Sequence, residues 1–103
     1  MYKLAFFVPM ADAERVKLAV FATGAGCIGQ YEHCCFESQG TGQFRPLPGA
    51  NPQLGEIDQL ERVAELKVEL VCEDALIQAA VAAMKAVHPY ETPAYEVWRL
   101  EDF

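Results

Sequence analysis

The chain has 103 residues, of which 52% are hydrophobic, and carries a formal net charge of −7. The hydrophobic fraction excludes a disordered chain, and we expect residues 1–103 to form a single domain with its own core. The eight basic residues are scattered, which excludes long nucleic acid as a partner, because phosphate binding needs clustered Lys and Arg. No apolar run reaches the roughly 18 residues of a membrane span, so no membrane partner is expected.

The start of the chain predicts a strand. Residues 2–8 are almost continuously apolar, as in a central strand, and Pro9 ends the run. A secretory signal peptide would need a basic n-region and a small-residue cleavage site, and neither is present. The sequence therefore predicts a cytoplasmic protein.

A helix is expected next, from about residue 12 to residue 23. Asp12 is a typical helix cap, and a broad apolar stripe runs from Val16 to Ala22. Gly24 stands where a helix commonly stops. Residues 28–38 then predict a second strand, Gly40 and Gly42 a turn, and residues 43–46 the start of a hairpin partner. By composition, residues 46–55 are a long loop that packs over the surface.

The second half predicts a strand, a helix and a strand. Residues 62–72 alternate between apolar and charged side chains, as in a half-buried antiparallel strand. Residues 75–87 predict a helix that Pro89 ends, and residues 94–100 predict the last strand. With residues 43–46 as an extra hairpin strand, the order is the ferredoxin-like βαββαβ. This is an α+β fold, an antiparallel sheet with two helices on one face.

Residues 24–29 match the G-x-G-x-x-G pattern but not its context. A dinucleotide fingerprint follows a strand and opens a helix, whereas here a helix precedes the glycines and a strand is expected after them. The alternatives are an anion-binding nest of backbone N–H groups, or a helix stop joined to a close packing contact. The second alternative is favoured.

The four cysteines form no C-x-x-C pair, so we expect them to be reduced and mostly packed. His33 and Cys35 would share one face of the predicted second strand and offer two ligands to a metal such as Cu(I) or Zn(II). A third ligand would come from His88, Cys72 or another subunit. The competing interpretation is a packed strand with a hydrogen-bonded imidazole.

His88-Pro89-Tyr90-Glu91-Thr92-Pro93 follows the second helix. His88 and Glu91 together have the chemistry of a general acid–base pair or of a ligand contact. No nucleophile stands near them in the sequence. In the favoured structural interpretation the prolines stiffen the entry to the last strand, and His88 caps the preceding helical carbonyls.

Three blocks of the sequence resemble a known family. They are Gly24-Ala25-Gly26 with Ile28-Gly29-Gln30-Tyr31 and Cys34-Cys35-Phe36, then Gly40-Thr41-Gly42-Gln43-Phe44-Arg45-Pro46 with Gly49-Ala50-Asn51-Pro52-Gln53-Leu54-Gly55, and His88-Pro89-Tyr90-Glu91-Thr92-Pro93-Ala94-Tyr95. They are similar to the domain inserted in bacterial YqfO proteins, of the family of type-two homologues of GTP cyclohydrolase I. The resemblance implies a PII/CutA-like fold and a stand-alone version of that insert.

The same resemblance carries over no metal ligand and no cyclohydrolase activity. In that family the dinuclear metal site belongs to the two halves that flank the insert, and neither half is part of this sequence. PII- and CutA-like relatives are commonly oligomers, often trimers, with small-molecule or metal sites between subunits. The resemblance therefore implies self-association as a homo-oligomer, with a trimer as the first expectation.

The leading functional hypothesis is a non-catalytic oligomeric module that binds a small ligand or a partner protein. The expected ligand-binding residues are Tyr31, Phe44, Arg45, His88, Tyr90 and Glu91. The alternative is a CutA-like divalent metal-binding protein that uses His33, Cys35 and His88. An enzyme with a His88–Glu91 pair ranks last, and a purely structural role for residues 88–93 competes with all three. The sequence identifies neither the ligand nor a cofactor.

Overall fold

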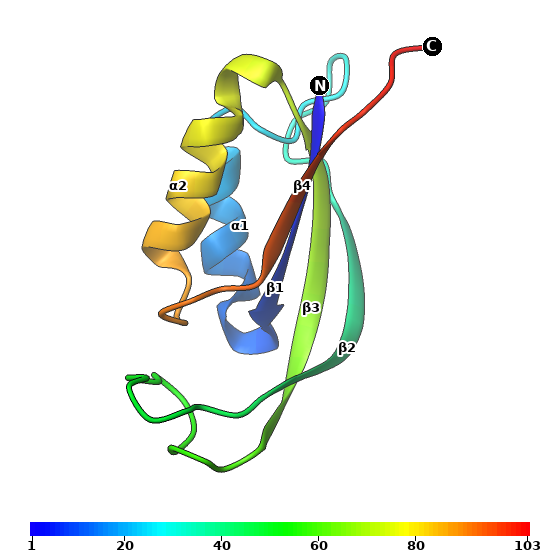
Figure 1. Cartoon of the computed structure of the whole chain (residues 1–103). Coiled ribbons are helices and arrows are strands. Elements are labelled where there is room, and N and C mark those ends of the chain that lie inside the picture. Colours follow the sequence, from blue (N-terminus) through cyan, green and yellow to red (C-terminus); the bar gives the residue numbers. More distant parts are fainter.

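The computed structural model describes residues 1–103 as one sheet with two helices packed against it (Figure 1). The elements follow the chain as β1 (Tyr2–Pro9), the 3₁₀ turn η1 (Met10–Asp12), α1 (Ala13–Phe21), β2 (Phe36–Phe44), β3 (Glu61–Cys72), the 3₁₀ turn η2 (Asp74–Leu76), α2 (Ile77–Val87) and β4 (Tyr95–Arg99). Neither helix combines the length and the apolar composition that a membrane crossing requires.

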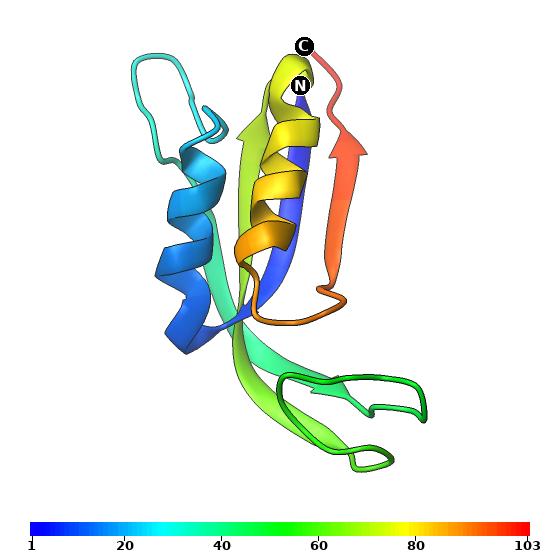
Figure 2. The ribbon, with the colours of Figure 1, turned by 90° about the vertical axis from the view of Figure 1, so that its left-hand side faces the viewer.

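The four strands are arranged in the order β2-β3-β1-β4, and every neighbouring pair is antiparallel. Both helices cover the same face of the sheet, which Figure 2 shows with α1 and α2 in front of the strands. Each half of the chain supplies one strand, one helix and one more strand. This arrangement confirms the predicted α+β, ferredoxin-like βαββαβ fold.

The core lies between the sheet and the helices. In β1 and β3 alternate residues face it, because the register pairs Leu4 with Leu70 and Phe6 with Val68. The helices contribute their apolar stripes to the same core. The buried helical residues are Ala13, Val16, Val20, Phe21, Ala80 and Met84. The alternation predicted for residues 62–72 is therefore confirmed from Leu66 to Cys72.

The glycines after α1 end the helix and permit close packing. Gly24 has φ +97°, which stops the helix as predicted. Gly26 has φ +81° and donates its N–H to the carbonyl of Val71, and a Cβ there would lie 2.7 Å from the Phe21 ring. These contacts agree with a helix stop joined to a packing contact. Asp12, however, makes no capping hydrogen bond, and its carboxylate accepts one from Arg15.

The second strand begins later than the sequence predicted. Residues 28–35 are irregular, with an isolated bridge between Ile28 and Tyr31, and β2 starts only at Phe36. The predicted turn at Gly40 and Gly42 is wrong, because both glycines lie inside β2 and pair with β3. Residues 43–44 are the end of the same strand, so the extra hairpin strand is also wrong. The connection between β2 and β3 is instead the long segment 45–60.

The segment 45–60, here named the β2–β3 loop, extends the molecule to 46 × 24 × 24 Å. It contains no helix or strand, which confirms a loop over residues 46–55. A turn closes between Leu47 and Ala50, with Gly49 at φ +104°. In both views the loop folds back toward the segment that follows α2 (Figures 1 and 2). Two parts of the chain distant in sequence thus meet at this end of the sheet.

Candidate functional site

The site begins where β1 extends beyond its neighbour β4. The register of β4 against β1 ends at Phe6, and the next backbone bond runs from the Phe7 N–H to the Ala94 carbonyl at 3.2 Å. The Phe7 carbonyl has no strand partner on this edge. The Nε2 atom of His88 lies 2.7 Å from that carbonyl oxygen and donates to it. The imidazole thus takes the place of a backbone donor.

His88 uses its second ring nitrogen as well. Nδ1 accepts the backbone N–H of Tyr90 at 3.1 Å, which fixes the neutral ring in the form protonated at Nε2. The side chain is only 6% exposed. The sequence predicted that the His88 side chain caps the carbonyls of α2. This is wrong, because the ring is turned toward β1. The two bonds set the course of the chain from α2 to β4.

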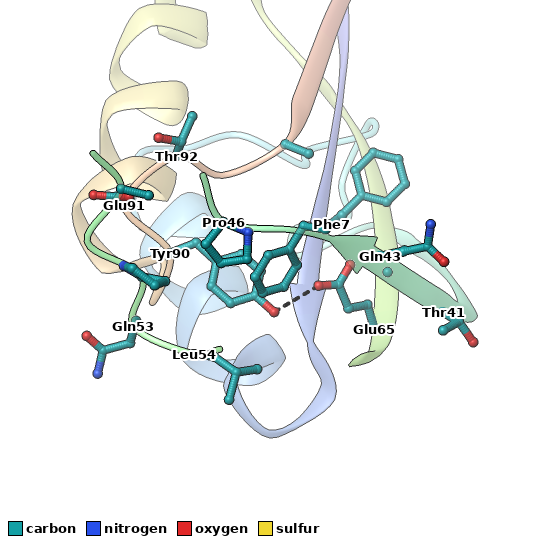
Figure 3. A pocket seen from close by; sticks show the side chains of 15 residues that line it. Phe7, Thr41, Gln43, Pro46, Gln53, Leu54, Glu65, Tyr90, Glu91 and Thr92 are labelled. Atoms are coloured by element: carbon teal, nitrogen blue, oxygen red, sulfur yellow. Dashed lines mark hydrogen bonds between the residues drawn. The ribbon is translucent and has the colours of Figure 1, made fainter. Parts of the chain in front are cut away.

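Tyr90 connects the segment after α2 to β3. Its hydroxyl donates to Oε2 of Glu65 at 3.0 Å, the bond drawn in Figure 3. Glu65 is only 8% exposed, although it lies in the polar half of the alternating pattern of β3. Burial, and then the bond to the Glu65 carboxylate, raise the pKa of Tyr90 well above its ordinary value. The tyrosine therefore keeps its proton and acts as the donor.

Gly42 provides the space for the Glu65 carboxylate. A Cβ at position 42 would lie 2.2 Å from Oε1 of Glu65, far inside van der Waals contact. A Cβ at Gly40, two residues earlier in the same strand, would meet nothing within 4 Å. The two glycines thus have different roles. Gly42 is required by a close approach, and Gly40 is not.

A cavity of about 460 Å³ opens beside the Tyr90–Glu65 pair (Figure 3). Its walls come from the ends of β1, β2 and β3, from the β2–β3 loop, and from the segment that follows α2. The 15 lining residues are Phe7, Thr41, Gly42, Gln43, Phe44, Pro46, Ala50, Pro52, Gln53, Leu54, Glu65, Tyr90, Glu91, Thr92 and Ala94.

Hydrogen bonds and an ion pair hold the β2–β3 loop over this cavity. The backbone N–H of Asn51 donates to Oε1 of Glu91 at 3.0 Å, which joins the tip of the loop to the segment after α2. At the base, the Asp58 N–H donates to the Pro46 carbonyl at 2.7 Å. Arg45 lies 3.7 Å from the Asp58 carboxylate. The loop is therefore held at its tip and at its base.

The cavity is rich in aromatic rings and has an acidic wall. The rings of Phe44 and Tyr90 are 5.6 Å apart and tilted, and Phe7 lines the same space. Its carboxylates are those of Glu65 and Glu91, and no Lys, Arg or His is among the lining residues. The arrangement suits a ligand with an apolar body that donates hydrogen bonds.

The structure brings together some of the predicted ligand-binding residues. Phe44, Tyr90 and Glu91 lie in the wall of the cavity, with the His88 ring 5.1 Å from that of Tyr90. Arg45 is turned to Asp58 at the base of the loop. Tyr31 is 75% exposed in the irregular segment between α1 and β2. That segment lies at the opposite end of the sheet from the β2–β3 loop (Figure 1). Ligand binding by any of these residues stays a prediction.

The predicted metal residues are not grouped within the chain. The chain contains no cluster of three or more His, Cys, Asp or Glu side chains suited to a metal ion. His33 has φ +58° and stacks on Phe21 at 4.8 Å, outside any strand, so the shared strand face expected for it and Cys35 is wrong. Cys35 packs against the core, and burial raises the pKa of its thiol. Metal binding between subunits stays a prediction.

No two cysteines are joined in the structure, and their reduced state stays a prediction. Cys72 is buried, Cys34 and Cys35 are half-buried, and Cys27 is exposed. Three of the four are thus at least partly packed. Cys72 belongs to the core under the helices, far in sequence from the other three.

Sequence reasoning missed several residues of the site, chiefly Glu65, Gly42 and Phe7. Glu65 was placed on the solvent face because it alternates with apolar neighbours. One signal was available, since a glycine inside a strand, such as Gly42, often marks the close approach of another group. Phe7 was expected only as part of a central strand. The folding back of the loop, which makes a wall of these residues, has no local signal in the sequence.

No family model matches the chain. Individual proteins do match it. The chain is 44% identical over 99 residues to the "GTP cyclohydrolase 1 type 2 homolog" of Bacillus subtilis, and 46% identical over 98 residues to the protein of that name from Mycobacterium leprae. These alignments cover 96% and 95% of the chain, but only 26% of each relative. The chain thus spans about a quarter of the length of the curated relatives it matches.

Solved structures agree with the sequence matches. A Bacillus cereus protein related to NIF3 superposes with a TM-score of 0.83 at 42% identity, over 98% of this chain and 26% of that one. The predicted resemblance is confirmed. CutA1 of Ehrlichia chaffeensis superposes with a TM-score of 0.68 at 21% identity, over 99% of this chain and 82% of its own, and therefore shows the fold alone. The chain is a homologue of one segment of the GTP cyclohydrolase 1 type 2 homologues.

Replacing His88 by alanine should destabilise this segment. The His88→Ala variant leaves the part-buried Phe7 carbonyl without a donor, and we expect the free energy of unfolding to fall by about 1–3 kcal/mol. Urea denaturation followed by circular dichroism measures the change. An unchanged midpoint would mean that the imidazole does not hold the edge of β1.

The two glycines of β2 offer a matched pair of variants. Gly42→Ala should displace the Glu65 carboxylate from Tyr90 and lower the free energy of unfolding by about 1–3 kcal/mol. Gly40→Ala should be neutral or stabilising by less than about 1 kcal/mol, because its Cβ meets open space. Thermal denaturation of both variants checks this. Equal effects at the two positions would contradict the role given to Gly42.

Proposed function

We propose that the chain is a non-catalytic, self-associating module that binds a small ligand in the cavity beneath the β2–β3 loop. The cavity itself carries the proposal. Its volume of about 460 Å³ lies within the roughly 300–1,000 Å³ of typical ligand sites. Like those sites, it combines aromatic walls with a few polar groups that converge on one space. Every residue of its wall belongs to a single chain.

The hydrogen-bonded groups of the wall favour binding over catalysis. The hydrogen-bonded pair of titratable side chains in the wall is Tyr90 with Glu65, and the raised pKa of Tyr90 keeps the proton on the tyrosine. Glu91 is engaged by the Asn51 backbone. Both carboxylates are thus held in position rather than paired with a nucleophile. Such groups orient a ligand.

Self-association is supported by the exposed edge of the sheet. β4 is an edge strand whose outer side pairs with no other strand, and it exposes Tyr95, Val97 and Trp98. Trp98 lies opposite Lys3 in the register, on the face of the sheet that the helices do not cover. Edge strands with apolar side chains commonly pair with another chain. We propose a homo-oligomer built on this edge, with three subunits as the first expectation from the PII/CutA-like fold.

A cavity-filling variant tests ligand binding. A fragment panel of small aromatic and aliphatic compounds, with Cu and Zn salts included, is screened by thermal shift against the unaltered chain. We expect at least one fragment to raise the melting temperature saturably, because it binds the folded state. Ala50→Phe fills the cavity from the loop and should abolish that shift.

Leu47→Phe is the matched control, because Leu47 lies in the same turn and outside the cavity wall. Its shift should equal that of the unaltered chain. A flat panel, or hits that survive Ala50→Phe, would contradict binding at this site. A metal salt that shifts all three proteins equally would place metal binding elsewhere on the chain.

A charge on the exposed edge tests self-association. Trp98 is 39% exposed, and Trp98→Glu should convert an oligomer to a monomer, because it introduces a charge into the proposed interface. Analytical ultracentrifugation over a range of concentrations measures the mass. Gln78→Glu adds the same charge on the exposed side of α2 and should leave the oligomer intact. A monomeric unaltered chain at every concentration would refute the proposal.

A further inference from the structure

We infer that the cavity selects a small organic cation, such as an ammonium or a protonated nitrogen heterocycle joined to an apolar body. The inference rests on the proposed function and gives the chemical class of its ligand. Three features carry it: a buried carboxylate of which one oxygen has no partner in the chain, aromatic rings in the same cavity wall, and the absence of basic side chains from that wall.

The Glu65 carboxylate is held by one of its oxygens only. Oε2 accepts the Tyr90 hydroxyl, and this is the one hydrogen bond that the chain makes to the Glu65 carboxylate. Oε1 lies beside Gly42, another residue of the cavity wall, where the missing side chain leaves room. The Glu65 side chain as a whole is only 8% exposed, and Oε1 is its solvent-accessible oxygen, so a charged donor can reach it from the cavity and gain from the low exposure of the carboxylate. The geometry therefore favours an N⁺–H group of a ligand at Oε1.

Aromatic rings complete the recognition of a cation. Phe7, Phe44 and Tyr90 line the cavity, and the negative faces of such rings attract an ammonium within about 6 Å. Phe7 already shows this behaviour, with the Lys67 ammonium 5.9 Å from its ring centroid. The apolar residues of the loop, among them Pro46, would cover the body of the ligand. Charge and shape thus favour the same class of molecule.

Neighbouring basic groups are engaged elsewhere. Arg45 pairs with Asp58, and Lys67 lies 3.8 Å from the Glu69 carboxylate. Both ring nitrogens of His88 are bonded to the backbone. An anion in the cavity would meet the carboxylates of Glu65 and Glu91, and the ammonium beside the Phe7 ring, that of Lys67, already lies near the Glu69 carboxylate. Phosphates and nucleotides, which need Arg, Lys or free backbone N–H groups, are disfavoured.

A series of probes matched in size separates charge from shape. Benzylammonium, benzyl alcohol and benzoate share one ring and differ in charge, and NMR titration of the folded chain measures their affinities. We expect benzylammonium to bind about tenfold more tightly than benzyl alcohol, and benzoate to bind most weakly, since a charged hydrogen bond is worth that difference. Equal affinities, or a preference for benzoate, would overturn the inference and leave the proposed ligand site standing.

Glu65→Gln tests the source of the preference, because it retains the size of the side chain and an acceptor for Tyr90. It should weaken benzylammonium about tenfold and leave benzyl alcohol unchanged. Glu73→Gln is the control, since it removes an exposed charge directly after the same strand and outside the cavity wall. A preference that survives Glu65→Gln would overturn the inference. If Glu65→Gln fails to fold, the three probes on the unaltered chain still test the preference for a cation. If no probe and no fragment binds, the proposed function is refuted as well.

Discussion

The unequal lengths of β1 and β4 are the constraint on which this end of the molecule depends. β4 pairs with β1 only as far as Phe6, and the part-buried Phe7 carbonyl beyond it would cost about 1–3 kcal/mol if it had no donor. The His88 imidazole supplies the donor to Phe7 and, through its other nitrogen, fixes the backbone of Tyr90. One side chain therefore completes the sheet and positions the next residue of the site.

The cavity follows from the same chain of contacts. Tyr90, once positioned, reaches Glu65, and the carboxylate fits only because position 42 has no side chain. Glu91 then engages the backbone of Asn51 and holds the β2–β3 loop over the opening. Space remains between these groups because each is tied to a backbone or to a polar partner rather than packed against the others. Rigid polar contacts thus maintain an unfilled space that ordinary apolar packing would close.

The sequence predicts the parts of the fold that carry a hydrophobic period. Strand β3 alternates, the helices have apolar stripes, and Gly24 ends α1, so these elements are largely where the pattern indicated. Strand β2 has no such period, because its residues are mostly exposed and polar, and it was placed too early. The burial of Glu65 depends on Tyr90, 25 residues away, and no local pattern encodes such a contact. Prediction therefore failed where the site is built from tertiary contacts.

The location of the whole cavity within this chain also has a consequence for the longer relatives. Every group that lines the cavity, and every bond that holds its loop, comes from the quarter of those proteins that this chain matches. The wall needs no residue from the remaining three quarters. A ligand site in this segment would therefore be built without residues from the rest of a longer protein.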